Sequence, residues 1–333
     1  MKIWRLIGTA LVILGICSPS ATTGMLQQGG SKKIIIGMIG KIEANPVFQA
    51  AYAGARVAAR ELGPKYNVEV EIEYQSPRVQ SAREQAETID RLSRSGVAGI
   101  AISVSDASVL APAIDRAIGL GTEVLCFDSD APLSKRFAYY GPNDLDFGRQ
   151  LAKELAEELK GKGTIAVLAG TRTALNLQRR LQGMREELKQ YPGITIMPNG
   201  IFNHLEEAQS AVEIVKRVQK ENPGINGWAF IGSWPLQMKN SLPWEPGTVK
   251  AVAGNAVPVE LAFVESGHVQ ALVGVNCFQM GYRSVELLLD KIVKHQKPVD
   301  PLLYTPLTPV DQSNVKEWTL NWRKWLLKEA LSK

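Results

Sequence analysis

The sequence predicts an α/β protein made of two doubly wound lobes, each a parallel sheet flanked by helices. Three observations carry this prediction. Short runs rich in Val and Ile alternate with longer segments whose apolar residues recur at helical spacing. The short runs lack a polar alternate face, which is typical of strands buried on both sides. About nine such runs fall into two series, which favours two lobes over a single sheet.

The first series begins with a β-rich apolar run at Ile34–Gly40 and ends near Tyr139. The helix after this run has apolar residues at helical spacing and stops at Gly63 and Pro64, because these residues terminate helices. The next run alternates apolar and polar residues, as expected of a strand. Strands are expected at Ile34–Gly40, Val68–Tyr74, Gly99–Ser103 and Glu123–Phe127, and helices at Val47–Leu62, Val79–Arg94 and Ala107–Leu120.

The second series repeats this rhythm, and its β-α units imply parallel strands joined by right-handed crossovers. A last helix at Val315–Leu331 carries Trp318, Trp322 and Trp325 on one face, which favours packing against its own protein over a partner surface. Strands are expected at Thr164–Ala169, Ile194–Pro198, Gly227–Ile231, Val249–Ala253 and Val269–Val273, and helices at Asp144–Lys160, Ala174–Gln190, Leu205–Glu221, Val257–Ser266 and Met280–Lys294.

Residues 1–24 have the layout of a secretory signal peptide. Lys2 and Arg5 precede an apolar run at Leu6–Cys17, and small and turn-forming residues follow. The run is too short for a membrane anchor, which needs roughly 20 apolar residues. A lipid anchor at Cys17 is the weaker alternative, because Ile16 stands where a small residue is expected. The mature chain is therefore expected to be exported.

Composition and motifs exclude several classes of function. Without Lys2 and Arg5 the chain has 36 basic against 33 acidic residues, which leaves no basic footprint for nucleic acid. Two cysteines remain in the mature chain and are expected to be small buried residues, and no spacing suggests a metal site. No cofactor-binding or catalytic motif is present. His204, His268 and His295 are expected at the surface, and Glu206 and Glu207 as a solvated helix start.

The loops at the carboxyl ends of the expected strands are the places where such sheets bind ligands. These loops carry amides, a carboxylate, a guanidinium and aromatic rings. Carboxylate oxygens and a guanidinium fork each engage two adjacent hydroxyls, and aromatic faces pack on the C–H side of a sugar ring. The mixture predicts an uncharged, hydroxyl-rich ligand.

Six segments, in this order, resemble the periplasmic sugar-binding proteins of ribose/glucose type. The similarity covers about residues 33–310. The segments are Ile34–Gly40, Asn45–Phe48, Val124–Ser129, Tyr140–Gly148, Asn176–Met184 and Gly274–Tyr282.

The resemblance implies the type I periplasmic binding protein fold, with a hinge of three chain crossings and a cleft for one sugar. It implies a first lobe of residues 33–141 plus 277–306 and a second lobe of residues 142–276 plus 307–333. It further implies a monomer in the periplasm that delivers sugar to the membrane permease of an ABC transporter, without a cofactor. A sensor that presents sugar to a chemoreceptor or sensor kinase and an exported sugar-active enzyme are the alternatives. A sugar-responsive transcription regulator would begin with a helix-turn-helix in place of residues 1–24.

The resemblance also implies the ligand-binding residues. Departures from the family pattern at Val47, Ser129 and Ser233 leave the identity of the sugar open. For several candidates a structural role is the alternative, such as helix capping for Asn45 and Asp128 or core packing for Phe48. The candidates are Asn45, Phe48, Asp128, Asn176, Arg180, Trp234, Asn255 and Asn276.

Overall fold

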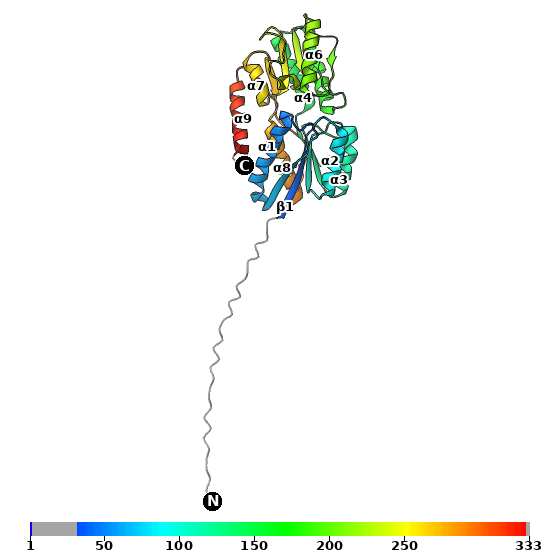
Figure 1. Ribbon diagram of the computed structural model, residues 1–333, viewed down its shortest axis with the longest axis vertical. Coiled ribbons are helices and arrows are strands. Elements are labelled where there is room, and N and C mark those ends of the chain that lie inside the picture. Colours follow the sequence, from blue (N-terminus) through cyan, green and yellow to red (C-terminus); the bar gives the residue numbers. More distant parts are fainter. Residues whose placement is uncertain (2–31, 331–333) are drawn as a thin grey trace. The chain divides into compact units, whose positions relative to one another are not determined.

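We describe a computed structural model of the chain, which covers Met1 and residues 32–330. The expected signal peptide and Cys17 lie outside the described residues. Residues 32–330 belong to one compact unit, which is drawn in colour in Figure 1. The predicted α/β class with two doubly wound lobes is confirmed, because two six-stranded sheets flanked by helices make up this part of the chain.

The first sheet has the strand order β11-β5-β4-β3-β1-β2, and all its strands are parallel. Helices α2 and α3 pack together on one side of it, and α1 and α8 on the other (Figure 1). Its strands are β1 (Lys32–Ile39), β2 (Val68–Tyr74), β3 (Gly99–Ile102), β4 (Glu123–Phe127), β5 (Ala138–Gly141) and β11 (Leu302–Tyr304). Its helices are α1 (Pro46–Leu62), the short η1 (Pro64–Tyr66), α2 (Ala82–Arg94), α3 (Ala107–Gly119) and α8 (Cys277–Val293).

The second sheet repeats this plan in the order β12-β10-β9-β8-β6-β7, with β12 antiparallel to β10. The connection from β8 to β9 contains the short η2 in place of an α-helix, as its prolines predict. The strands are β6 (Lys162–Leu168), β7 (Gly193–Phe202), β8 (Gly227–Phe230), β9 (Lys250–Asn255), β10 (Ala271–Gly274) and β12 (Thr308–Asp311). The helices are α4 (Asp144–Glu158), α5 (Leu175–Leu188), α6 (Ala208–Glu221), η2 (Trp234–Gln237), α7 (Pro258–Glu265) and α9 (Val315–Ala330).

Within the described residues the chain passes between the two sheets at residues 142–143, 275–276 and 305–307. Helix α4 therefore starts the second lobe and α8 returns to the first. The family resemblance implies a second lobe that includes the last helix. In the structure α9 contacts α7 of the second lobe and α1 of the first.

Three of the strands described here, β5, β11 and β12, were not predicted from the sequence. They have three or four residues each, and β11 is partly exposed, so none forms the long buried run that marks a strand. The residues expected at the break between the series, around Tyr139, form β5.

One helix pair in each lobe crosses at glycines. A Cβ atom on Gly54 of α1 would lie 1.9 Å from the backbone oxygen of Phe278 in α8, and one on Gly281 would lie 1.7 Å from that of Ala51. In the second lobe, a Cβ on Gly148 of α4 would lie 1.8 Å from the Arg180 oxygen in α5. The absence of side chains thus lets these helices touch through their backbones.

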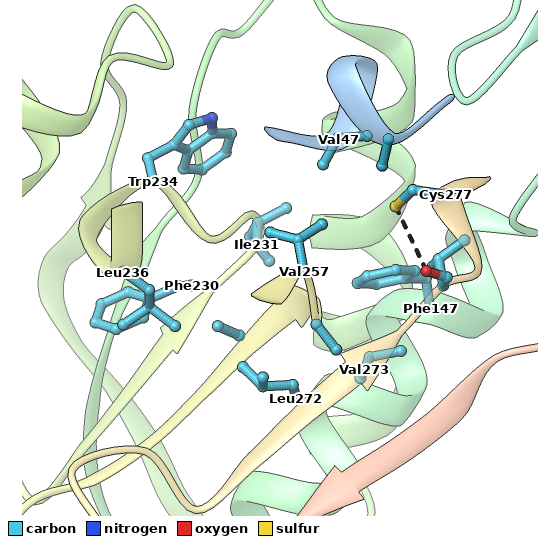
Figure 2. Close-up of a cluster of buried hydrophobic side chains, with 14 of the residues drawn as sticks. Val47, Phe147, Phe230, Ile231, Trp234, Leu236, Val257, Leu272, Val273 and Cys277 are labelled. Carbon is cyan, nitrogen blue, oxygen red and sulfur yellow. Dashed lines mark hydrogen bonds between the residues drawn. The ribbon is translucent and has the colours of Figure 1, made fainter. Parts of the chain in front are cut away.

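Large apolar side chains fill the interior of the second lobe. Figure 2 shows Phe147 of α4 close to Cys277, whose thiol lies 3.4 Å from the Val275 carbonyl oxygen. Cys126 and Cys277 are both buried, as expected of small core residues. Burial raises the pKa of each thiol, so neither is poised as a nucleophile. The three tryptophans of α9 pack on their own protein, so that prediction is confirmed.

Candidate functional site

A cleft lies where the carboxyl ends of the two sheets face each other. In both sheets the strand order reverses beside the first strand, between β1 and β3 and between β6 and β8, which is where doubly wound sheets bind ligands. The cleft contains a cavity of about 40 Å³. Its lining residues are Lys41, Ile42, Asn45, Val47, Phe48 and Asp128 from the first lobe, and Asn176, Leu177, Arg180, Glu206, Gly232, Trp234, Gln237 and Asn255 from the second.

Helix α1 supplies an amide and an aromatic ring to the first-lobe wall. The Asn45 side chain caps this helix by accepting the Val47 N–H at 2.9 Å, so Asn45 both caps the helix and lines the cleft. Phe48 is buried and meets Phe127 edge to face, with ring centroids 6.4 Å apart. Its position is fixed by the core on one side, while the cleft lies on the other.

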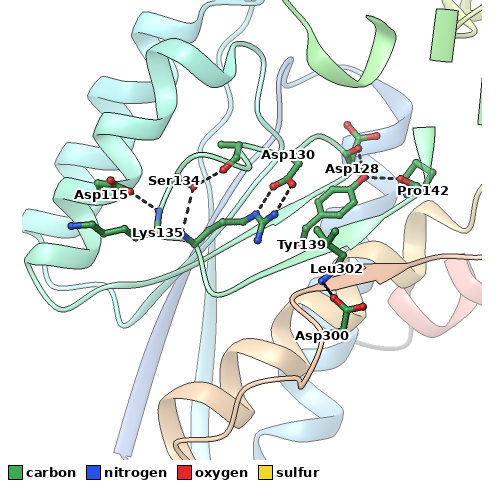
Figure 3. Close-up of polar contacts among 11 residues, drawn as sticks. Asp115, Asp128, Asp130, Ser134, Lys135, Tyr139, Pro142, Asp300 and Leu302 are labelled. Carbon is green, nitrogen blue, oxygen red and sulfur yellow. Dashed lines mark hydrogen bonds and ion pairs between the residues drawn. The ribbon is translucent and has the colours of Figure 1, made fainter. Parts of the chain in front are cut away.

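Asp128 follows β4 and has a left-handed backbone, with φ of 58°. Its carboxylate accepts the Ser103 hydroxyl at 2.7 Å and retains further acceptor sites. The Tyr139 hydroxyl lies 3.0 Å from the carbonyl oxygens of both Asp128 and Pro142. Figure 3 draws these contacts as dashed lines. Tyr139 therefore ties the backbone of a cleft residue to the first crossing between the lobes.

Two hydrogen bonds join the lobes across the cleft. The Lys41 ammonium donates to Asn176 Oδ1 at 3.1 Å, and the Gln80 amide donates to Glu206 Oε1 at 3.1 Å. Lys41 is only 3% exposed, so its charge is held in the cleft and not in bulk solvent. Its remaining N–H groups are donors of the kind that a hydroxyl-bearing ligand accepts.

Arg180 reaches the cleft from α5 and forms a buried ion pair. Its Nε donates to Asp144 Oδ1 at 2.8 Å, and its guanidinium carbon lies 3.8 Å from the centre of the Phe147 ring. Burial raises the pKa of Asp144 to about 6, while the Arg180 charge and hydrogen bond oppose this shift. Protonated Asp144 therefore contributes its whole stabilisation of the fold below its unfolded pKa near 4. This contribution to the free energy of unfolding is lost as the pH rises through about 6. The Gly148 contact described above sets this geometry, since it brings α4 and α5 together.

The loop after β7 differs most from expectation. His204 is buried, and burial lowers its pKa to about 4, so the imidazole is neutral at pH 7. Its Nδ1 accepts the Glu206 N–H at 3.1 Å, and its ring meets Trp234 edge to face with centroids 4.6 Å apart. The expectation of a surface His204 is therefore wrong.

Glu206 is buried in the cleft, so the expectation that it lies on a solvated helix start is wrong. Glu207 is exposed, as expected. The physical reason is its backbone: a φ of 63° at Glu206 is incompatible with a helix, which begins at Ala208.

Asn255, at the end of β9, donates through Nδ2 to the Ser233 hydroxyl oxygen at 3.2 Å. Asn276 is not brought to the cleft lining. Its side chain caps α8 by accepting the Gln279 N–H at 2.9 Å, at the second crossing between the lobes. Seven of the eight predicted residues thus meet at one cleft, while Lys41, Gln80 and Glu206 were missed.

Glu260 of α7 lies directly behind this wall and is fully buried. Its Oε2 accepts the Val257 N–H at 2.9 Å, and its Oε1 has no hydrogen-bond partner among the described residues. Burial raises its pKa to about 8, an effect that the Ser233 hydroxyl and nearby backbone amides partly offset. The carboxyl is therefore largely neutral at pH 7.

Replacing Glu260 with glutamine should change how stability depends on pH. In the native protein the stabilisation from the protonated Glu260 is full below the unfolded pKa near 4.5 and is lost as pH rises through about 8. Between pH 4 and pH 9, the variant should therefore gain about 3–5 kcal/mol of unfolding free energy relative to wild type. Denaturant unfolding at both pH values measures this, with the exposed Glu265→Gln on the same helix as control. An equal difference at both pH values would show that the pKa of Glu260 is not raised in the fold.

No group of three or more His, Cys, Asp or Glu side chains that would suit a metal ion occurs in residues 32–330. In the same part of the chain no helix is both long and apolar enough to span a bilayer.

The family model for a periplasmic binding protein domain matches residues 36–296. A solved solute-binding protein of an ABC transporter from Burkholderia graminis, in complex with D-arabinose, is 26% identical. The alignment covers 87% of this chain and 99% of that one, with a TM-score of 0.78. A solute-binding protein from Actinobacillus succinogenes with bound D-allose shares the fold at 20% identity, with 85% and 99% coverage and a TM-score of 0.75.

A curated D-ribose/D-allose-binding protein of Pseudomonas aeruginosa is 22% identical over 185 residues. These residues are 54% of this chain, and the match spans 57% of the length of that relative. The likeness to the family thus extends over the two lobes and the cleft between them.

Proposed function

The chain belongs to the periplasmic binding protein family, and from this premise we propose that it captures a monosaccharide or related polyol and delivers it to an ABC-type permease. The observation that carries the proposal is the pair of half-sites at the carboxyl ends of the two sheets. One half brings Phe48, Asp128 and an ammonium group, and the other brings Trp234 and Arg180. The neighbour that holds D-arabinose supports the same ligand class.

The charges of the cleft favour a neutral ligand over an anion. Arg180 is already neutralised by Asp144, and the carboxylates of Asp128 and Glu206 would repel a negative group. The same carboxylates accept hydroxyl protons, while the Lys41 ammonium donates to hydroxyl oxygens. Two aromatic rings, Phe48 and Trp234, supply the apolar surface that a sugar ring covers with its C–H groups.

Binding proceeds by opening and closing of the lobes. The cavity of about 40 Å³ holds little more than one water, so a sugar ring enters only when the lobes separate about the three crossings. When the lobes close, the groups of the second lobe contact a ligand that is already bound to the first lobe. The ligand shifts this equilibrium through contacts that are better in the closed form, which is the form that the permease reads.

A thermal-shift screen of the mature chain tests the ligand class. At 100 times its dissociation constant, a ligand stabilises the fold by about 2.7 kcal/mol, which raises the melting temperature by several degrees. We expect this for at least one sugar among D-arabinose, D-ribose, D-allose and D-tagatose or among hexoses, polyols and inositols. A flat response to all of these, with a clear response to amino acids or nucleosides, would refute the proposed ligand class.

Solution scattering tests the mechanism. The bound sugar should reduce the radius of gyration, and it should be recovered unchanged after long incubation because the site binds without chemistry. Turnover of the sugar would instead favour an exported enzyme, and binding without compaction would contradict closure.

A further inference from the structure

The last helix, α9, lies outside the residues that the family model matches, which end at 296. Figure 1 shows it running beside α7 of the second lobe and toward α1 of the first. Its apolar face includes Val315 and three tryptophans. Two of them, Trp318 and Trp322, direct their indole N–H groups at one backbone atom, the carbonyl oxygen of Ala256, at 2.7 and 2.8 Å. Both acceptor positions of this oxygen are thereby used.

Ala256 and the cleft residue Asn255 form an unusual backbone segment. Both have positive φ, 84° at Asn255 and 58° at Ala256, although neither is glycine. The left-handed region is strained for Ala256, whereas asparagine tolerates it better, so the segment keeps this conformation only if the surroundings hold Ala256. Without it, the Asn255 side chain would leave its place beside Ser233 in the cleft wall.

The surroundings hold the segment at three places. The Val275 N–H donates to the Asn255 carbonyl oxygen at 3.1 Å, and the Glu260 carboxyl accepts the Val257 N–H at 2.9 Å. The two indoles of α9 provide the third support, at Ala256 O. They are the support that comes from furthest along the chain, 62 and 66 residues away.

We propose that Trp318 and Trp322 are positioning residues of the ligand cleft: by holding the Ala256 carbonyl they fix Asn255 in its left-handed conformation and present its amide to the ligand. The C-terminal helix is then part of the binding machinery without touching the ligand. Only the role of Asn255 toward a sugar rests on the proposed function. The control of the loop by α9 is a property of the fold alone.

The third tryptophan provides a matched control. Trp325 stacks on Phe278 of α8, with ring centroids 6.2 Å apart and planes inclined by 12°. It also meets Trp318 and Trp322 edge to face, with centroids 6.1 and 5.0 Å apart, but it makes no hydrogen bond to Ala256. Replacing it with phenylalanine removes an indole from the same helix. A general loosening of α9 would appear in this variant as well, whereas loss of the hydrogen bonds to Ala256 would not.

The first measurement needs no ligand. Hydrogen exchange of the segment 254–257 should become about tenfold faster in the double variant Trp318→Phe/Trp322→Phe, the size expected from losing one or two buried hydrogen bonds. It should change little in Trp325→Phe. Unchanged exchange in the double variant, or equal acceleration in both variants, overturns the proposal.

The second measurement is a double-mutant cycle on affinity for D-arabinose, with D-allose and D-ribose as further probes. The double phenylalanine variant should bind about tenfold more weakly, and this loss should vanish when Asn255 is already alanine. Full affinity in the double variant, or a loss that persists in the Asn255→Ala background, contradicts positioning through Asn255. If wild type binds no sugar while the exchange result holds, the proposed function fails and the control of the loop by α9 stands.

Discussion

Replacing Asp128 with alanine is expected to weaken sugar binding by about 2–5 kcal/mol, because ligand hydroxyls and the Ser103 hydroxyl would lose a charged acceptor in a buried site. The loss should appear mainly as faster dissociation, since a buried group and not a steering charge is removed. Isothermal calorimetry with the sugar found in the thermal-shift screen measures it.

Two controls separate charge from structure. Asp128→Asn keeps the shape and tolerates the left-handed backbone, so its smaller loss would report the charge together with one acceptor oxygen. Asp146→Ala removes an exposed carboxylate on α4 and should leave affinity unchanged. Wild-type affinity in Asp128→Ala would remove this residue from the site.

Replacing Gly148 with alanine is expected to destabilise the protein by about 3 kcal/mol or more. The new methyl group would lie 1.8 Å from a backbone oxygen of α5, and neither helix backbone can yield without repacking the core. The melting temperature should fall by roughly 5 °C or more. Because that oxygen belongs to Arg180, the shift of α5 would also move the guanidinium and weaken sugar binding.

Gly119→Ala is the matched control. This glycine ends α3, and an added Cβ meets no atom within 4 Å. Its melting temperature should stay the same or rise slightly, because alanine favours the helix. Equal effects at the two positions would mean that the close crossing of α4 and α5 is not what Gly148 provides.

The sequence predicted those parts of the fold that have a local pattern. Strands β1, β3 and β4 are short apolar runs that pack on both faces, and their positions follow from this continuous apolar pattern. The edge strand β12 contains Pro309 and pairs antiparallel with β10, so its partner and not its own residues makes it a strand.

The distinction between local sequence patterns and contacts with distant residues also explains which cleft residues could be predicted. Asp128 and Asn255 lie in loops after expected strands, where parallel sheets place their ligand-binding loops, and the family resemblance assigned both residues to the ligand. Lys41 and Glu206 are ordinary charged residues in the sequence. Their burial depends on partners 135 and 126 residues away, in the opposite lobe, and no local spacing encodes such a contact.

The threefold passage of the chain between the lobes has a consequence for how the molecule is assembled. Helix α8 and strand β11 complete the first lobe, yet both are synthesised only after most of the second lobe. A nascent chain of about 270 residues would lack the backbone partner of Gly54 on α1. Neither lobe is formed by one continuous stretch of the chain. The first lobe can therefore complete its fold only once residues up to β11 are available, and contacts between distant residues set the pace of folding.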